Sequence, residues 1–184
     1  GPIKVRLASI DAPERGQPGG REAIAALAAR LKGRQVGLEV VNQSDGFHRM
    51  VAIVWIGDEN VNEWLVRQGH AWAFRGPYLH DRRMCAIERI ARAAQLGLWA
   101  RAERNYAPWE WRHVRPGQYD RLKDFEAETV EECASTAPAG SRDAAASQHG
   151  GRAQVAASRC TIKGNISRSG RIYHLPGSAS YERT

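Results

Sequence analysis

Apolar and charged residues alternate over residues 4–7 of the chain. An alternation with a period of two residues predicts a half-buried β-strand. We expect the extended segment to end before Pro13, because proline lacks a backbone donor, and Asp11 suits a turn because its side chain can bond nearby backbone. The pattern therefore predicts a rigid corner that presents Asp11, the Ala12 carbonyl and Glu14 together.

Three later stretches are predicted to be helices. Two of them place apolar residues at helical spacing, and the other is short and has a small apolar face. The first helix is expected to begin at Arg21 and to stop at Gly33, since glycine accepts the left-handed conformation that ends many helices. The second is short, with Asn60 before its first turn and Gly69 after its last. The third covers residues 80–95. The residues expected on its inward face are Met84, Ile87, Ala91 and Ala94.

Further strands are predicted over residues 35–41, 49–56 and 71–74. The strand over residues 49–56 is apolar on both faces apart from its first residue, so we expect it to be central in the sheet. Residues 108–111, which read Pro-Trp-Glu-Trp, are expected to pack back on the core.

Composition divides the chain into three predicted regions. Residues 1–116 hold all six tryptophans and 18 Lys and Arg against 12 Asp and Glu, a net charge of +6, and are expected to form one globular domain. Residues 117–157 carry 4 against 7, or −3, and are predicted to be an acidic segment and an Ala-, Gly- and Ser-rich linker. Residues 158–184 carry 5 against 1, or +4, and are too few for an independent core.

The whole chain has a net charge of +7, which favours a polyanionic partner such as nucleic acid. Cys85, Cys133 and Cys160 lack the spacing of metal ligands, and their odd number leaves at least one unpaired within the chain. We find no transmembrane run and no visible signal peptide, so no membrane association is expected. The sequence begins with Gly1 rather than Met.

The predicted corner has side chains that suit a divalent metal ion and a phosphate. Carboxylate and carbonyl oxygens are the ligands that calcium and magnesium prefer, and the guanidinium of Arg6, a few residues upstream, can bind a phosphate through two hydrogen bonds. A structural interpretation stays open, in which Arg6 is an ordinary strand arginine and Glu14 a solvated turn residue. In that interpretation Arg49 is an ion-pair partner of Asp45.

Four stretches resemble the staphylococcal-nuclease-like (thermonuclease) family, in the family's order and with its spacing. They are VRLASIDAPE at 5–14, SDGFHRMVAIVW at 44–55, VNEWLVRQGHAW at 61–72 and GLWA at 97–100. The resemblance implies an α+β fold, an OB-like five-stranded β-barrel with three helices.

The resemblance also implies a calcium-dependent endonuclease, a phosphodiester hydrolase that acts on DNA, RNA or both with little sequence specificity. Matched residue by residue, Arg6 and Arg49 resemble the family's two phosphate-binding arginines. Asp11 resembles a calcium ligand, with the Ala12 carbonyl beside it. Glu14 resembles the residue that activates the attacking water. Two fixed guanidinium groups and a divalent ion can stabilise the charge that develops on the phosphoryl group.

Two departures from the family pattern concern this site. The family has another metal-binding aspartate in an Asp-Gly-Asp turn upstream of the first visible strand, and we expect this turn and two barrel strands to be missing here. His48 stands where the family usually has glycine, and histidine tolerates a left-handed backbone better than most residues.

Phe47, His48 and Tyr78 are candidate substrate-binding residues, because aromatic rings stack on bases and an imidazole can contact a phosphate. Solvent exposure is the alternative for His48 and core packing the alternative for Phe47 and Tyr78. Phe74 is expected in the core.

Residues 160–184 resemble part of a small C-terminal module, called sunset, that is appended to bacterial thermonucleases, and this copy is expected to be truncated. The resemblance favours a secreted or periplasmic location and a monomer. Two other hypotheses stay open: a barrel that binds nucleic acid or protein without cutting, and an inactive truncated fragment.

Overall fold

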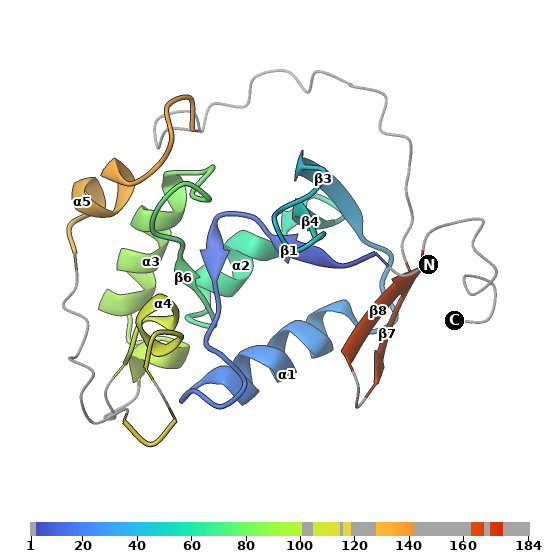
Figure 1. Cartoon of the computed structure of the whole chain (residues 1–184), viewed down its shortest axis with the longest axis horizontal. Coiled ribbons are helices and arrows are strands. Elements are labelled where there is room, and N and C mark those ends of the chain that lie inside the picture. The colour runs from blue at the N-terminus through green and yellow to red at the C-terminus, as the bar shows by residue number, and fades with distance from the viewer. Residues whose placement is uncertain are drawn as a thin grey trace. The chain divides into compact units, whose positions relative to one another are not determined.

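The computed structural model describes residues 3–100, 105–114, 116–118 and 128–141, together with the backbone of residues 163–167 and 170–174. Figure 1 shows these elements along the chain. In chain order they are β1 (Val5–Leu7), β2 (Ile10–Asp11), α1 (Gly20–Leu31), β3 (Gly37–Asn42), β4 (Met50–Ile56), β5 (Glu59–Asn60), α2 (Val61–Arg67), β6 (Trp72–Ala73), α3 (Arg83–Ala93), the 3₁₀ turn η1 (Gly97–Ala100), α4 (Pro108–Trp111), α5 (Val130–Ser135), β7 (Lys163–Ser167) and β8 (Gly170–His174).

The chain separates into two compact units. The first unit is made of Gly1–Ala8, Ala28–Val61 and Ser147–Thr184, and the second of Ser9–Leu27 and Asn62–Ala146. The second unit therefore includes residues 128–141, which the composition assigns to the acidic segment and linker. No helix within the described ranges is long and apolar enough to cross a membrane.

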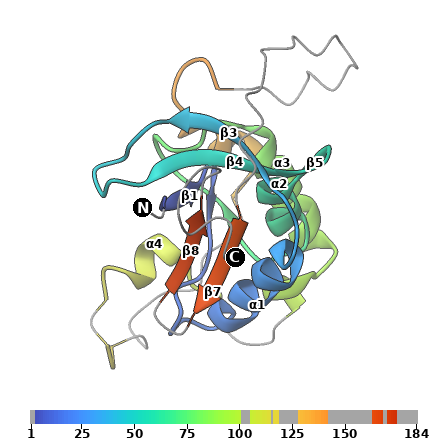
Figure 2. The same cartoon turned by 90° about the vertical axis from the view of Figure 1, so that its right-hand side faces the viewer.

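The first unit is built around β4, which pairs with β1 in parallel and with β3 and β5 in antiparallel orientation. Figure 2 shows β3 and β4 as neighbouring ribbons. Val51 and Ala52 on β4 are completely buried, and Val51 and Ile53 pack with Ala8 in one apolar cluster. The predicted central position is therefore confirmed, because β4 is paired along both of its edges, with β1 on one side and β3 on the other.

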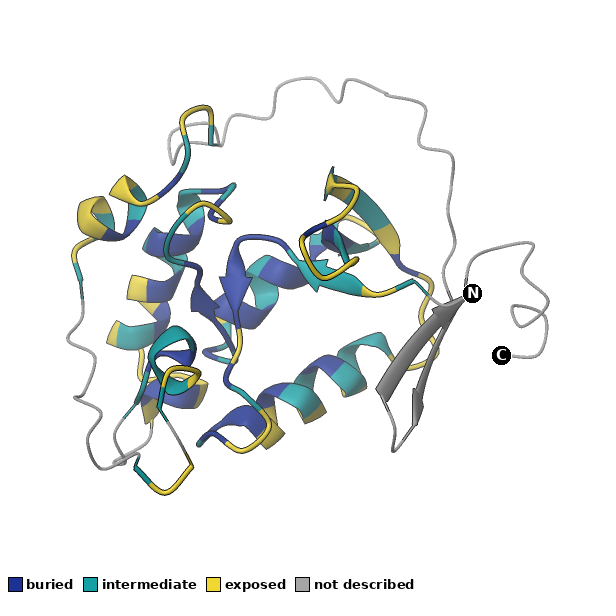
Figure 3. Cartoon of the chain, viewed as in Figure 1, coloured by how far each residue is buried: buried dark blue, intermediate teal, exposed yellow. Residues whose placement is uncertain are grey.

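The second unit has a tryptophan-rich core around a short sheet. β2 pairs with β6 so that Asp11 lies opposite Trp72, and Figure 3 shows both strands as buried. The rings of Trp99 and Trp109 meet the ring of Trp72 edge-on, at 4.7 and 5.4 Å between centroids, a geometry that aromatic pairs favour. This contact confirms that the Pro-Trp-Glu-Trp segment packs back on the core.

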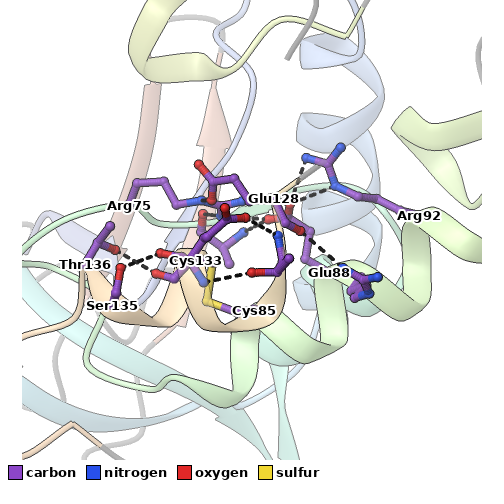
Figure 4. Close-up of polar contacts among 12 residues, drawn as sticks. Arg75, Cys85, Glu88, Arg92, Glu128, Cys133, Ser135 and Thr136 are labelled. Atoms are coloured by element: carbon purple, nitrogen blue, oxygen red, sulfur yellow. Dashed lines mark hydrogen bonds and ion pairs between the residues drawn. A yellow bond between two sulfur atoms is a disulfide. The ribbon is translucent and has the colours of Figure 1, made fainter. Parts of the chain in front are cut away.

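Helix α3 has a different inward face from the one predicted, because it buries a carboxylate. Met84 and Ala91 are buried as expected, whereas Ala94 is exposed and Glu88 is only 2% exposed. Glu88 accepts hydrogen bonds from the Ala73 backbone at 2.7 Å, from both terminal nitrogens of Arg75 at 3.0 and 3.1 Å, and from Nε of Arg92 at 2.8 Å (Figure 4). These partners satisfy the buried charge, which would otherwise be costly.

A disulfide joins Cys85 on α3 to Cys133 on α5 (Figure 4). Helix α5 begins in a capping box, in which the Thr129 hydroxyl accepts from the Glu132 backbone and the Glu132 carboxylate accepts from the Thr129 backbone. An ion pair of 2.8 Å between Arg75 and Glu128 adds a second tie. The cysteine pairing could not be read from the sequence, and Cys160 lies outside the described residues.

The α+β class is confirmed, and so are the three longer predicted helices, α1, α2 and α3. The closed five-stranded barrel is not seen among the described strands. β1 and β3 are the two outer strands of their sheet, and β2 pairs with β6 in a separate two-stranded sheet. Closure would require the outer strands to pair onward, and no such pairing occurs within the described part of the chain.

Near the C-terminus, β7 and β8 form an antiparallel hairpin with Lys163 opposite His174.

Candidate functional site

The corner that the sequence predicted lies in the second unit and starts at Ser9. Ser9 has a positive φ of 63° and is buried. Its backbone N–H donates to the Tyr78 carbonyl at 3.2 Å, its carbonyl accepts from Phe74 at 2.9 Å, and its hydroxyl accepts from the His80 backbone at 3.0 Å. These three bonds fix the backbone at Ser9, two residues before Asp11.

The two carboxylates of the corner share one arginine. Nη1 of Arg112 lies 3.1 Å from Asp11 Oδ1 and 3.1 Å from Glu14 Oε1, and Nη2 lies 2.7 Å from Asp11 Oδ2. The hydrogen bonds to Asp11, followed by those to Glu14, raise the pKa of the Arg112 guanidinium above its usual value. Asp11 and Glu14 are therefore brought together, as predicted.

Arg112 was not predicted as a site residue. It lies 101 residues from Asp11 in the sequence and caps the C-terminus of α4. The sequence carried no local signal for this contact, because the position of Arg112 depends on how α4 packs on the tryptophan core.

The loop after the corner is held by a buried glutamine. Oε1 of Gln17 accepts from the Glu14 backbone at 3.1 Å, and Nε2 of Gln17 donates to the Tyr106 carbonyl at 2.6 Å. At Gly20, a Cβ atom would lie 1.9 Å from the Glu14 carbonyl oxygen. Any residue other than glycine would therefore displace the loop that carries Glu14. The backbone of Glu14 is thus fixed from two directions.

The two arginines predicted to bind phosphate lie in the first unit. Arg6 is on β1, opposite Val51 in the parallel register, and Arg49 immediately precedes β4. Nε of Arg49 donates to Asp45 Oδ2 at 2.7 Å, and Nη2 lies 2.6 Å from the same oxygen. The ion pair with Asp45 that the structural interpretation allowed is therefore present, and it fixes the direction of the Arg49 guanidinium.

Asp45 organises the whole loop before β4. Its Oδ1 also accepts from the backbone of Phe47 at 2.9 Å and of Arg49 at 3.0 Å. The hydrogen bond from the Arg49 side chain is the main cause that lowers the pKa of Asp45 to about 2. His48 sits in this loop with a φ of 55°, as expected for a position where the family usually has glycine.

The candidate substrate-binding residues differ in exposure. Phe47 is 74% exposed, and the Arg49 guanidinium lies 5.0 Å from its ring centroid. His48 lines an open pocket of about 430 Å³; the other lining residues are Ile3, Lys4, Gln43 and Met50. Tyr78 is 38% exposed and meets the ring of Phe74 edge-on at 5.4 Å, and Phe74 is buried, as expected.

Whether these residues fit a calcium ion depends on the donor set. Asp11, the Ala12 carbonyl and Glu14 supply oxygen atoms of the kind that calcium prefers, but calcium takes six to eight ligands. No group of three or more His, Cys, Asp and Glu side chains comes within metal-binding reach in the described ranges. The donors fit calcium in kind, and further oxygen ligands would be needed to complete the coordination.

Comparisons with known proteins agree with this arrangement of motifs. The model of the family "Staphylococcal nuclease homologue" matches residues 4–101, more than half of the chain. The chain therefore belongs to the staphylococcal nuclease homologue family, and the resemblance seen in the sequence is confirmed.

Three relatives illustrate the match. "Protein ParB" of Escherichia coli is 36% identical over 132 residues, which cover 65% of this chain and 72% of that protein. An "uncharacterized endonuclease" of Haemophilus influenzae is 36% identical over 110 residues, 60% of each chain. The "probable staphylococcal-like nuclease CAN2" of Oryza sativa subsp. japonica is 36% identical over 111 residues, 59% of this chain but 29% of the rice protein. The chain thus spans less than two thirds of the latter two relatives.

Proposed function

We propose that the chain is a nuclease, a calcium-dependent phosphodiesterase that hydrolyses DNA, RNA or both. Family membership supports the proposal, as do relatives that are named nuclease or endonuclease. The observation that carries it is the contact of Asp11 and Glu14 with one nitrogen of Arg112, which brings a candidate metal ligand and a candidate base to one place.

Each residue has a proposed role. Glu14 takes a proton from the attacking water, and its 45% exposed side chain leaves it accessible to water. Arg6 and Arg49 donate hydrogen bonds to the phosphoryl oxygens as negative charge develops on them. Asp45 supports Arg49 in this role, because it holds the guanidinium in one orientation before substrate binds.

Asp11 and the Ala12 carbonyl would hold the calcium ion, which supplies a Lewis acid that stabilises negative charge on the phosphate. Phe47 and Tyr78 are proposed to stack on bases, and His48 to contact the sugar-phosphate chain from its pocket. Contacts to phosphate and to the faces of bases carry little sequence information, so low sequence specificity is expected. The closed OB-like barrel of the family is part of the same proposal.

The proposal is tested by nicking of supercoiled plasmid and cleavage of a labelled RNA, each with calcium and with EDTA. Glu14→Gln should abolish calcium-dependent cutting, with a loss of at least about 10²-fold, because general bases typically contribute this much. Glu131→Gln, the same chemical change on an exposed residue of α5, is the matched control.

Two outcomes would contradict the proposal. Cutting that persists in Glu14→Gln would remove Glu14 from the reaction. No cutting by a folded chain that still binds an oligonucleotide in fluorescence anisotropy would favour the non-catalytic binding barrel.

The disulfide supports a secreted or periplasmic location, since disulfides persist in oxidising compartments and are rare in the cytosol. Alkylation of the protein in its native cells, followed by mass spectrometry, tests this point. Cys85 and Cys133 should be protected from the alkylating agent, and modification of both would place the chain in a reducing compartment.

A further inference from the structure

Arg112 occupies the oxygen atoms that the proposed calcium ion needs. Its guanidinium meets Asp11 end-on, with one terminal nitrogen on each carboxylate oxygen, at 3.1 and 2.7 Å. The same Nη1 reaches Glu14 at 3.1 Å. Two carboxylates are thus neutralised in part by one cation that belongs to the chain itself.

The position of Arg112 is set by the packing of the segment that carries it. Trp109, three residues earlier, packs on Trp72, and the Arg75 guanidinium lies 5.4 Å from the Trp109 ring centroid. Ala107 is completely buried, and the carbonyl of Tyr106 is bound by Gln17 at 2.6 Å. Gln17 belongs to the loop that holds Glu14. Its hydrogen bond to Tyr106 therefore gives the segment that carries Arg112 a second contact with the loop that carries the carboxylates.

The side chain of Arg112 is nevertheless open to solvent. It is 39% exposed, whereas the Asp11 side chain is only 10% exposed. Because water can solvate a partly exposed guanidinium, giving up such an ion pair costs little free energy. The structure therefore joins a fixed acceptor, Asp11, to a donor that can leave it.

From this geometry we propose that Arg112 is a built-in counter-cation that holds Asp11 and Glu14 in the metal-free chain and competes with calcium for them. The inference rests on the proposed function, because it assumes that Asp11 ligates calcium. A doubly charged ion and a guanidinium on the same carboxylate oxygens repel each other, so binding of one weakens binding of the other. Arg112 thus sets how much calcium the site requires, and it keeps the carboxylates in place when calcium is absent.

The competition predicts two opposite effects of removing the guanidinium. Arg112→Met keeps the length and apolar stem of the side chain but loses its charge. Its calcium affinity should rise by about tenfold, within the range of roughly 5- to 150-fold that is usual for coupled sites. Its melting temperature in EDTA should fall, because Asp11 and Glu14 then repel each other without a cation between them.

The experiment is isothermal titration of the 184-residue chain with calcium chloride at fixed ionic strength, together with thermal melts in EDTA and at rising calcium. Arg112→Lys is a second variant that keeps the charge and loses the two-nitrogen fork, so its affinity should lie between the other two. Arg67→Met removes the same charge from an exposed arginine that pairs with Glu63 on α2, and it controls for net charge.

A tighter calcium site in Arg112→Met, with a larger calcium-induced rise in melting temperature than in the parent, supports the proposal. Unchanged or weaker calcium binding in Arg112→Met, when the parent binds calcium and cuts DNA, overturns this inference alone. A purely structural ion pair gives that result, since the variant is then less stable in EDTA without gaining affinity. Calcium binding by neither protein overturns the inference together with the calcium dependence of the proposed function.

Discussion

Two aspartate–arginine pairs are built by different parts of the sequence and differ in geometry: Arg49 places two nitrogens on one oxygen of Asp45, whereas Arg112 places one nitrogen on each oxygen of Asp11. In the first unit, Asp45 and Arg49 are four residues apart, and the aspartate also accepts two backbone N–H groups of the same loop. In the second unit, Asp11 and Arg112 are 101 residues apart, and the arginine is delivered by a helix that the tryptophan core holds. One pair is therefore a local loop tie and the other a long-range tie.

The difference teaches what each pair can do. The Asp45 side chain is 2% exposed and is satisfied from several directions, so it serves as a fixed support for Arg49. In the other pair the Asp11 side chain is 10% and Arg112 39% exposed, against 32% for Arg49, so the carboxylate of the long-range pair is the more accessible to another cation. Under the proposed function, the local pair orients Arg49 toward a phosphate, whereas the long-range pair limits the access of calcium to Asp11.

The largest effect that separates the two pairs should come from replacing each arginine by lysine. Arg49→Lys keeps the charge but loses the planar fork, and we expect the rate of phosphodiester cleavage at saturating calcium to fall by about 10²–10³-fold, or roughly 3–4 kcal/mol. Arg112→Lys is expected to change mainly the calcium concentration needed for half-maximal rate. Steady-state cleavage of a labelled oligonucleotide over a calcium series measures both quantities.

Arg67→Lys, an exposed arginine of α2, is the matched control and should cleave like the parent. If Arg112→Lys lowers the rate at saturating calcium as much as Arg49→Lys does, the distinction fails. Arg112 would then belong among the phosphate-binding groups.

A smaller effect should follow from removing another long-range contact, the disulfide between Cys85 and Cys133. Cys85 and Cys133 are 48 residues apart, and closing a loop of that length stabilises a fold by up to about 4 kcal/mol in the chain-entropy model, with measured values of about 2–4 kcal/mol. Cys133→Ala should therefore lower the melting temperature by roughly 5–15 °C in a protein of this size. Thermal melts of the variant and of the parent with and without reductant measure the shift.

Cys160→Ala controls for the loss of a thiol. Hydrogen exchange should show lost protection in α3 and α5, while the loop over residues 44–49, which is held by local bonds, keeps its protection. Equal loss of protection in that loop would show that the local tie depends on the long-range one.

The parts of the fold that the sequence predicted are those that local pattern controls. Helices α1, α2 and α3 follow from apolar spacing and from glycine stops, and Gly33 and Gly69 both have the positive φ that such stops require. The central position of β4 follows from its unbroken apolar run. The inward face of α3 was partly wrong, because Glu88 is buried against Arg75 of another segment as well as against Arg92 of its own helix, and apolar periodicity does not reveal a buried ion pair.

The candidate site divides in the same way. The gathering of Asp11 and Glu14 was predicted because both lie in one turn, and the pairing of Asp45 with Arg49 was foreseen as an alternative because the residues are neighbours. The place of Arg112 depends on how α4 packs, and the partner of Cys85 depends on where α5 docks. Contacts between segments that are far apart in the sequence require the tertiary structure, and no local pattern encodes them.

The smallest effect, and the sharpest probe of the local pair, is the acid dependence of Asp45. Its pKa is lowered from 3.8 to about 2, chiefly by the Arg49 side chain, so the ionised form is stabilised in the folded chain. The stability that Asp45 contributes is fully present above pH 4 and is lost as the pH falls through about 2. The advantage of the parent over Asp45→Asn in urea unfolding should therefore shrink between pH 4 and pH 2. Asp58→Asn, on an exposed turn residue, is the control, and an advantage that stays constant over this range would mean that Arg49 is not the group that holds Asp45 ionised.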